Sequence, residues 1–567
     1  MPIKRWKVKS PDVSTVSELQ ERHNLCKAVA EVLVVRGIES DAVTDFLKPQ
    51  LKNLSDPFDM PDMLKAVKRI WQAIQNAETI LIHGDFDTDG VTSTTLLSWV
   101  LEENSAKVKC FLPHRIHDGY GLTADSVKKC GEGVDVLITV DCGISSYEGV
   151  LEANKMGIDV IITDHHQPGS ELPEAHAVVN PKLNAERPDL HILAGVGVCF
   201  KLCHALLKYG REENIGGIQP DLKYGMDLVA LGTVADIVPL VGENRSMVRF
   251  GMEILRSQHR VGIHALCTAS GVSGEINTSD IGFRLAPRIN AAGRIGDAKD
   301  ALHLLQSDDV SKAHALATKL DDYNKERQTY ELDAFNEALD IIYANGLDKK
   351  KGIVVYGQNW HRGVVGIVAS RVTQEFHKPS IILTLENNEL QGSGRSIEGI
   401  NLVDCLDGCA SELIRYGGHP MAVGLSMETD KLESFSDMFC EHIETSYTDA
   451  NMFLPIVSII SILELADVDE RFFNQMNYLE PFGHKNQRPV FQFNNVLCPK
   501  VYPAGDKHCK GLLRDNSGGE FPFICFGRKP KDLPSGQWDV AGRPELNIYN
   551  GSAQPQIQIV DVRPAAI

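Results

Sequence analysis

Residues 79–90 read TILIHGDFDTDG, a short apolar, β-branched run that leads directly into a cluster of acidic residues and glycines. Two more runs of this kind follow, VDVLITV at residues 134–140 and IDVIIT at residues 158–163. Helical stretches separate the runs, a pattern typical of a parallel β-sheet in an α/β domain. Because such sheets bind ligands at the carboxyl ends of their strands, we expect the residues after each run to lie together.

The residues after these runs are carboxylates and imidazoles. They are His83, Asp85, Asp87 and Asp89 after the first run, Asp141 after the second, and Asp164, His165 and His166 after the third. Several oxygen ligands with a few imidazoles favour Mg²⁺ or Mn²⁺ over zinc or copper. An EF-hand calcium loop is the alternative for the first cluster, but Thr95 stands where that loop needs a glutamate. Three clusters at adjoining strand ends therefore predict a metal centre.

A further carboxylate, Asp236, stands in the apolar stretch LVALGTVADIVPL. Taken alone, it is best interpreted as a helix cap or a hydrogen-bonded core residue, because an unpaired buried carboxylate is costly. With the strand-end clusters in the same domain, a role as a metal ligand also stays open. The set of hard ligands, with Asp141 available to bridge, describes a site for two ions about 3.5–4 Å apart. Two such ions clamp a phosphate, activate water and stabilise the leaving oxygen, so the sequence predicts phosphoester hydrolysis.

The rest of the chain changes periodicity twice. Residues 297–345 contain no Gly or Pro and repeat apolar residues at helical spacing, which predicts a long helix or two in series. GIVVYG and PSIILTLE then flank a helix-like stretch, and short alternating runs follow from PVFQFNNV onward. We therefore expect an N-terminal extension (1–55), a parallel-sheet catalytic domain (56–300), a connecting helix (301–346), a smaller α/β domain (347–450) and an OB-like β-barrel (451–567).

The composition limits the class of protein. A net charge of −19 argues against a protein that coats duplex DNA with positive charge, although a local basic channel remains compatible with it. Residues 245–294 hold seven Arg and no Lys against three acids, a balance of +4, and arginine suits bidentate phosphate contacts. The thirteen cysteines form no CxxC pair, and no signal peptide or long apolar run occurs. We expect a cytoplasmic protein with reduced thiols and no membrane association.

HGDFDTDG, VDCG, TDHH and GTVAD occur in this order, and together they resemble the DHH phosphoesterase superfamily. Within it, SGRS at residues 393–396 and GGHPMAVGLSM from Gly417 resemble the DHH-associated domain of the bacterial single-stranded-DNA-specific 5′→3′ exonucleases. The resemblance covers nearly the whole chain. It implies an α/β fold, with a parallel-sheet DHH domain joined by a long helix to a smaller α/β DHH-associated domain, plus a C-terminal OB-like β-barrel.

Matched residue by residue, the resemblance implies roles for individual side chains. The metal ligands fall on His83, Asp87, Asp89, Asp141, His165 and Asp236. The catalytic residues fall on His166 beside the scissile phosphate, on Asp141 and on His419. A 5′-phosphate pocket falls on Arg115, Arg288, Ser393 and Arg395, with His419 on the substrate phosphate. Asp85 is expected to support a ligand instead of binding metal. Each arginine taken alone is better explained by a surface ion pair, and only the resemblance groups them into a pocket.

Two further segments remain open between a functional and a structural role. WHRG at residues 360–363 fits either a channel lining or an exposed loop around one buried aromatic residue. The barrel offers aromatic and basic side chains for stacking on single strands, although alternating Phe residues are more often core. These candidates are Phe491, Phe493, Tyr502, Lys507, Lys510 and Arg514.

The function implied by this resemblance is an exonuclease that uses two Mg²⁺ or Mn²⁺ ions. It would degrade single-stranded DNA from the 5′ end to 5′-mononucleotides, in DNA recombination and repair, mismatch repair included. The resemblance also implies a monomer that works beside a single-strand-binding protein and a helicase. The alternatives are a nucleotide or short-oligonucleotide phosphatase, which would be a smaller protein, and a non-catalytic replication scaffold, which would have lost metal ligands.

Overall fold

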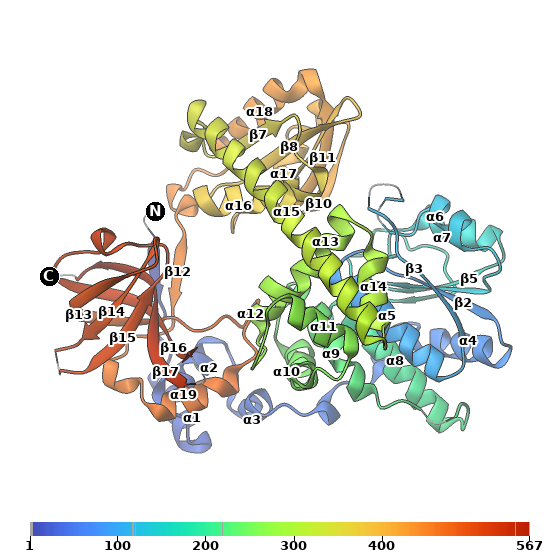
Figure 1. The fold of residues 1–567 in the computed structure, drawn as a ribbon, viewed down its shortest axis with the longest axis horizontal. Coiled ribbons are helices and arrows are strands. Elements are labelled where there is room, and N and C mark those ends of the chain that lie inside the picture. The colour runs from blue at the N-terminus through green and yellow to red at the C-terminus, as the bar shows by residue number, and fades with distance from the viewer. Residues whose placement is uncertain are drawn as a thin grey trace. The chain divides into compact units, whose positions relative to one another are not determined.

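The computed structural model describes residues 4–115, 118–119, 121–217, 219–516, 518–549 and 552–565. The chain forms two compact units. The parallel-sheet unit comprises Pro49–Arg327 with Pro481–Gln487, and the barrel unit comprises Met1–Lys48, Gln328–Glu480 and Arg488–Ile567. The long helix α15 (Val310–Ala344) contributes residues to both (Figure 1). In the described part of the chain, no helix combines the length and apolarity needed to span a bilayer.

The sheet of the parallel-sheet unit has the strand order β3-β2-β4-β5-β6, and every neighbouring pair is parallel. Its strands are β2 (Thr79–His83), β3 (Lys107–Phe111), β4 (Val136–Val140), β5 (Asp159–Thr163) and β6 (Ala177–Val179). The three apolar runs of the sequence are the adjacent strands β2, β4 and β5, with β3 and β6 at the edges. The strand ends that carry the ligand clusters are therefore neighbours.

Both faces of this sheet are covered by helices, which explains why its strands are apolar on both sides. On one face Ile80 and Ile138 join a core with the first group of helices, and on the other Leu81 and Leu137 join a core with the second (Figure 1). The first group is α4 (Met63–Gln75), α5 (Thr88–Glu103), α8 (Gly195–Glu212) and α9 (Met226–Ala235). The second is α6 (Ala124–Cys130) and α7 (Tyr147–Lys155).

A further group of helices extends the first core. It consists of α10 (Gly242–Ser257), α11 (Val261–Ala269), α12 (Thr278–Asp280), α13 (Ala286–Ile295) and α14 (Ala298–Gln306). A π-helical turn, Ile281–Leu285, precedes α13. The stretch without Gly or Pro is thus two helices in series, α14 and α15, which is one of the two forms the periodicity predicts.

The barrel unit contains a mixed sheet of order β10-β11-β9-β8-β7, in which β7 and β8 are parallel and the other pairs antiparallel. Its strands are β7 (Ile353–Gly357), β8 (Ser380–Glu386), β9 (Glu389–Arg395), β10 (Arg415–His419) and β11 (Ala422–Glu428). Its helices are α16 (Arg362–Phe376), α17 (Leu402–Asp407) and α18 (Leu432–Ser446). One sheet face packs on α16 and the end of α15, and the other packs on α17 and α18.

The C-terminal strands form a closed barrel of order β13-β14-β15-β17-β16. They are β13 (Phe491–Ala504), β14 (His508–Arg514), β15 (Glu520–Cys525), β16 (Gln537–Tyr549) and β17 (Ser552–Pro564). Phe491 and Phe493 are buried, whereas Tyr502 is 52% exposed. The two Phe residues are therefore core, and their candidacy as stacking platforms for DNA is wrong.

The amino-terminal segment belongs to the barrel unit. Its strand β1 (Arg5–Val8) pairs in parallel with β12 (Ile456–Ile459). Its helices are α1 (Val13–His23), α2 (Lys27–Val35) and α3 (Val43–Leu47), and α19 (Glu470–Met476) completes the unit. The segment boundaries expected from the sequence, at residues 55, 300, 346 and 450, stay predictions.

Helices α9 and α10 approach each other closely at one glycine. A Cβ atom on Gly251 would overlap the main-chain oxygen of Met226. We expect Gly251→Ala to push α10 away from α9 and to lower the free energy of unfolding by about 2 kcal/mol. Chemical denaturation measures this loss, with Gly217→Ala as the control, because a Cβ there meets nothing within 4 Å. Equal stability of the two variants would contradict this packing.

Candidate metal centre

The carboxyl ends of β2, β4 and β5 bring the predicted ligands together. Among the described residues, three overlapping sets have ligand atoms within 4.8 Å of one another. These are Asp85 with Asp87 and Asp141, Asp89 with His165 and Asp236, and Asp141 with His165 and His166. Asp141 and His165 each belong to two sets, so the sets form one continuous cluster. His83 lies at the end of β2 beside this cluster and outside the three sets.

Helix N-termini hold two of the carboxylates. Asp87 caps α5, and its Oδ1 accepts hydrogen bonds from the backbone N–H groups of Asp89 (2.9 Å) and Gly90 (3.1 Å). Asp89 accepts bonds from the first N–H groups of α8, Gly195 (2.7 Å) and Val196 (2.8 Å). These bonds fix both carboxylates, because helix N-termini stabilise negative charge.

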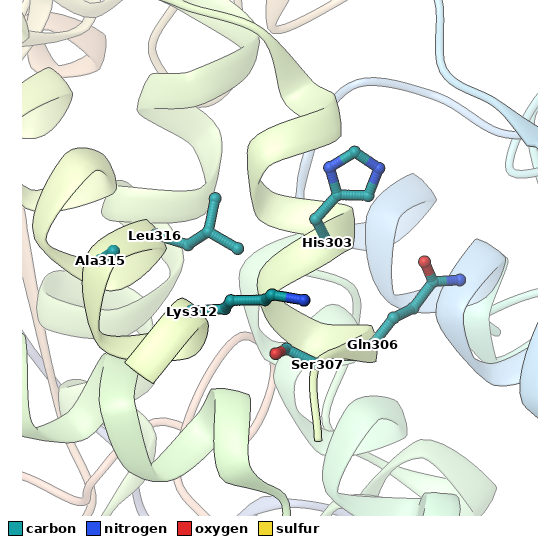
Figure 2. Close-up of a pocket in the computed structure, with 6 residues that line it drawn as sticks. All are labelled: His303, Gln306, Ser307, Lys312, Ala315 and Leu316. Atoms are coloured by element: carbon teal, nitrogen blue, oxygen red, sulfur yellow. The ribbon is translucent and has the colours of Figure 1, made fainter. Parts of the chain in front are cut away.

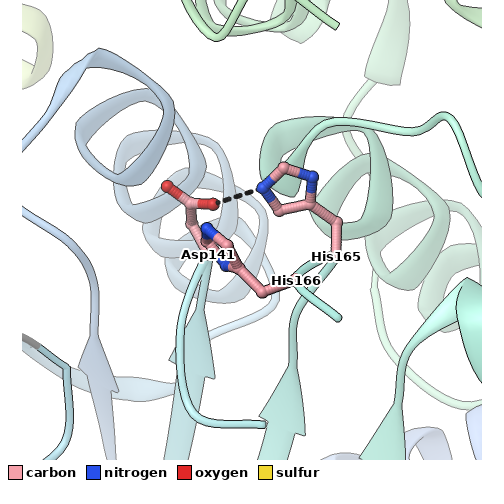
Figure 3. Close-up of side chains that lie close together, drawn as sticks. All are labelled: Asp141, His165 and His166. Atoms are coloured by element: carbon pink, nitrogen blue, oxygen red, sulfur yellow. Dashed lines mark ion pairs between the residues drawn. The ribbon is translucent and has the colours of Figure 1, made fainter. Parts of the chain in front are cut away.

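The Gly195 position must be glycine, because a Cβ there would overlap the carboxylate of Asp141. Asp141 itself has left-handed backbone geometry with φ 60°, which an aspartate tolerates better than most residues. Its Oδ1 lies 3.2 Å from Nε2 of His165 (Figure 3). The close approach of α8 and the turn at Asp141 together place this carboxylate between its neighbours.

The imidazole of His165 is oriented by the main chain. Its Nδ1 lies 3.0 Å from the carbonyl oxygen of Leu193, so Nδ1 carries the proton and Nε2 keeps its lone pair for a ligand. Burial, followed by the charge of His166, lowers the pKa of His165 to about 3. Burial likewise lowers the pKa of His83 to about 4. Both rings are therefore neutral at physiological pH, as metal ligands must be.

The carboxylates of the cluster repel one another. Burial and the neighbouring Asp87 raise the pKa of Asp85 to about 8 and that of Asp89 to about 7. Burial raises the pKa of Asp141 well above its ordinary value, and the charges of Asp89, Asp87, Asp236 and Asp85 add to the shift. The cluster thus concentrates negative charge that a cation would neutralise.

His166 differs from the other two imidazoles because it is paired. Its Nδ1 lies 2.7 Å from Oδ1 of Asp164, and Oδ2 of Asp164 accepts a bond from the N–H of Ile144 (2.9 Å). Burial lowers the pKa of His166, but the hydrogen bond and the charge of Asp164 outweigh it and raise the pKa overall. A protonated His166 beside the cluster can donate a hydrogen bond to a phosphate oxygen.

The orphaned polar atoms of the cluster fit a metal. In the described structure, the Nε2 atoms of His83 and His165 and the Oδ1 atom of Asp141 are buried without a hydrogen-bond partner. Buried polar atoms of this kind are costly unless a ligand engages them. Carboxylate oxygens with neutral imidazoles are the donor set that Mg²⁺ and Mn²⁺ accept. The residues present therefore fit such ions.

Asp236 and Asp85 both lie in the cluster, and the sequence left their roles less certain than those of the other carboxylates. Asp236 occupies the C-cap position of α9, and its carboxylate also belongs to the cluster, so the geometry is compatible with both roles left open by the sequence. The sequence predicts that Asp85 only supports a ligand. Its carboxylate, however, lies within 4.8 Å of those of Asp87 and Asp141, a spacing at which it could also bind a metal ion. The assignment of individual ligands stays a prediction.

The arginines of the parallel-sheet unit divide between the site and the framework. The guanidinium of Arg115 lies 5.2 Å from the ring of Phe86, in the loop that carries Asp85 and Asp87. Arg288 is bound to Asp321 (2.7 Å), and the neighbouring Arg284 is bound to Asp280 (3.3 Å). Ile116, His117 and Tyr120, from the same motif as Arg115, lie outside the described residues.

In the barrel unit, the remaining predicted residues share one face of the mixed sheet. Arg395 pairs with Ala422, which pairs with His419 on the next strand, so their side chains point to the same side. Ser393 lies two residues before Arg395 and therefore on this side too. A Cβ on Gly366 of α16 would lie 3.3 Å from both Ser393 Oγ and Arg395 Nη2, so these two groups converge.

Some contributing residues escaped prediction from the sequence. Asn290 accepts hydrogen bonds from the N–H and the hydroxyl of Thr88 (2.8 Å each), which ties α13 to the first turn of α5. The pattern of its motif, RINAAGR, indicates phosphate contacts through the arginines and gives no signal for this asparagine.

In the WHRG segment, the indole of Trp360 is buried and donates a hydrogen bond to Glu337 (2.8 Å). His361 caps α16, and its ring stacks on that of Tyr330 with the centroids 5.3 Å apart.

A separate pocket of about 440 Å³ opens between α14 and the start of α15. Figure 2 shows its lining, which consists of His303, Gln306, Ser307, Lys312, Ala315 and Leu316. It shares no residue with the carboxylate cluster. Its lining offers no set of converging acids and imidazoles, so the metal centre is the better candidate for chemistry.

Fold and site together define a phosphoesterase of the DHH class. The model of the DHH family, N-terminal domain, matches residues 79–233, the DHHA1 domain matches residues 349–445, and the RecJ OB domain matches residues 461–561. The single-stranded-DNA-specific exonuclease RecJ of Bacillus subtilis is 37% identical over 98% of this chain and 70% of its own length. The Escherichia coli protein of that name is 35% identical over 93% of this chain and 94% of its own length. The chain belongs to the RecJ family.

Solved structures agree with the sequence relatives. A crystal structure of RecJ from Thermus thermophilus in complex with Mn²⁺ matches with a TM-score of 0.86 and 30% identity, over 99% of this chain and 80% of that chain. The same protein in complex with Mg²⁺ matches with a TM-score of 0.79 and 29% identity, over 99% and 79%. The family and the fold class expected from the sequence are confirmed.

The crowding of carboxylates predicts an unusual response to neutralising one of them. Asp141→Asn removes one charge and keeps the left-handed geometry, which Asn also tolerates. Without metal, we expect this variant to melt about 3 °C above the wild type at pH 8. Because the folded-state pKa of Asp141 is raised, its cost to folding grows as the pH rises above the unfolded value near 4. The gain should therefore be smaller at pH 5.

Thermal melting with chelator, and then with Mn²⁺, checks both parts of this expectation. Mn²⁺ should raise the melting temperature of the wild type, because a ligand that binds only the folded state stabilises it. It should raise that of Asp141→Asn much less. A variant that is destabilised without metal, or that gains as much from Mn²⁺ as the wild type, contradicts the role given to Asp141.

Proposed function

We propose that this protein, as a RecJ-family exonuclease, uses two Mg²⁺ or Mn²⁺ ions to degrade single-stranded DNA from the 5′ end to 5′-mononucleotides. The observation that carries the two-ion proposal is the overlap of the ligand sets, in which Asp141 and His165 are shared. A shared carboxylate between two sets is the arrangement that bridges paired ions. The relatives named above support single-stranded DNA as the substrate.

The ions, when bound, would polarise the phosphate and lower the pKa of a water molecule. The side chains of this chain would hold the ions and orient the phosphate. His165 and His83 present neutral nitrogens, and the α8 N-terminus holds Asp89 in place. His166 pairs through Nδ1 with Asp164, which favours its protonated form, and its Nε2–H would donate a hydrogen bond to a non-bridging oxygen of the scissile phosphate.

The 5′ end would be anchored by the residues whose geometry suits a terminal phosphate. In the barrel unit, Ser393 and Arg395 converge next to Gly366, and His419 shares their face. A hydroxyl and a guanidinium at this spacing are donors for a phosphate dianion. In the parallel-sheet unit the candidates are Arg115, whose guanidinium lies 5.2 Å from the ring of Phe86, and Arg288, which is paired with Asp321.

The family also supports a proposal for the cellular setting. We propose that the protein acts in the cytoplasm as a monomer, in DNA recombination and repair, beside a single-strand-binding protein and a helicase. The barrel would hold the strand through exposed side chains. Tyr502 is one candidate for stacking, and Lys510 is its cross-strand partner on β14. A preference for single strands would come from a channel too narrow for a duplex.

Removal of a cluster carboxylate tests the catalytic site. Asp87→Ala should lower hydrolysis of single-stranded DNA by at least about 1,000-fold, because it removes a metal-binding group and a helix cap at once. Asp125→Ala is the matched control, since that carboxylate is 96% exposed in the same unit. DNA labelled at either end, single- or double-stranded, is digested with Mn²⁺ and with chelator. Release from the 3′ end, activity in chelator, or an active Asp87→Ala variant would each overturn the proposal.

A second substitution tests the 5′-end anchor. Arg395→Ala should raise KM about tenfold for DNA with a 5′-phosphate, because one charge-assisted contact is lost. The KM for DNA with a 5′-hydroxyl should change little. Steady-state kinetics on DNA with a 5′-phosphate and on DNA with a 5′-hydroxyl provide the measurement, with Arg22→Ala on helix α1 as a control. The same KM on 5′-phosphorylated DNA in wild type and Arg395→Ala would remove Arg395 from the pocket.

A further inference from the structure

The residue directly after Asp236 has an unfavourable backbone conformation. Ile237 has φ 60°, in the left-handed region where a β-branched side chain is a genuine outlier. Its N–H bonds to the carbonyl of Val234 (3.3 Å) just after α9 ends, the position that glycine usually occupies at a helix end. The fold therefore retains an isoleucine where it carries a steric cost.

Packing does not offset that cost within the parallel-sheet unit. Ile237 is 70% exposed, whereas its neighbours Val234, Ala235 and Val238 are half-buried against the core. A strained, exposed, apolar side chain gains nothing for the folded state. Strain of this kind persists at functional sites, where a ligand makes use of the side chain.

The position of Ile237 indicates which ligand that would be. Asp236 places its carboxylate in the metal cluster, and adjacent Cα atoms lie about 3.8 Å apart, so Ile237 stands at the edge of the cluster. A nucleotide whose phosphate is held at the cluster extends its base within reach of that edge. An apolar side chain can contact the face of any base, which suits an enzyme that must accept every sequence.

We propose that Ile237 is a substrate-positioning residue that packs against a nucleobase next to the scissile phosphate. This inference rests on the proposed function, because it takes the cluster as the place where the phosphate binds. The contact with DNA would offset the strain of the side chain only in the complex. It would thereby favour the register in which the phosphate, and not the sugar, faces the carboxylates.

The test uses two substitutions that adopt left-handed geometry readily, Ile237→Gly and Ile237→Asn, so that Asp236 keeps its place. Both should raise the melting temperature by about 2 °C and leave Mn²⁺ affinity unchanged. Both should raise KM for single-stranded DNA about tenfold, with kcat changed by less than about twofold. Ala77→Gly is the control, because Ala77 has φ 55° after α4, at the amino end of the sheet, and should gain stability with no change in KM.

Oligonucleotides with an abasic site at one of the first three positions separate a base contact from other effects. At one position, loss of the base should raise the wild-type KM about tenfold and the variants' KM little further. The inference would be overturned if the variants had the KM of the wild type or a lower melting temperature. It would also be overturned if the substitutions raised KM by the same factor on abasic DNA as on intact DNA. A wild type that fails to cut single-stranded DNA would instead overturn the proposed function.

Discussion

Mutual repulsion among buried carboxylates is the constraint on which the rest of the site depends. Asp85, Asp89 and Asp141 are almost completely buried, and Asp87 and Asp236 lie beside them. Water cannot screen these charges, so the fold must supply the stabilisation. For Asp87 and Asp89 it does so with backbone dipoles, since the N-termini of α5 and α8 supply the N–H groups that bind them. A lysine or arginine in their place would compete with a metal.

This use of helix N-termini determines much of the surrounding packing. For α8 to bring its first N–H groups to Asp89, it must approach Asp141, and only glycine at position 195 leaves room. For α5 to begin at Asp87, its first turn is tied to α13 through Thr88 and Asn290. The acidic motif after β2 is thus held from two sides by segments more than a hundred residues away.

The sequence predicted the parts of the structure that are encoded locally. The runs before His83, Asp141 and Asp164 carry both the strand pattern and the ligands, so the central strands and their shared edge could be predicted. Strand β3 was missed because Lys107 and Lys109 alternate with its apolar residues at the edge of the sheet, and β6 is only three residues long. The pairing of β1 with β12 joins positions some 450 residues apart, which no local pattern encodes. The left-handed backbone at Ile237 could not be predicted from the sequence either, because isoleucine does not favour a positive φ.

The charge balance of the cluster also explains why divalent ions suit this site. Two such ions would offset four of the five negative charges carried by the clustered aspartates, and the charge of Arg115 already lowers the pKa of Asp85 in part. In the absence of metal, protons must take over this task, which is why the pKa values of Asp85 and Asp89 lie near 8 and 7. Metal binding at neutral pH therefore has to displace protons, and the affinity for the ions should increase with pH. A phosphodiester can approach these carboxylates only where their charge is neutralised in this way, all the more in a protein with a net charge of −19.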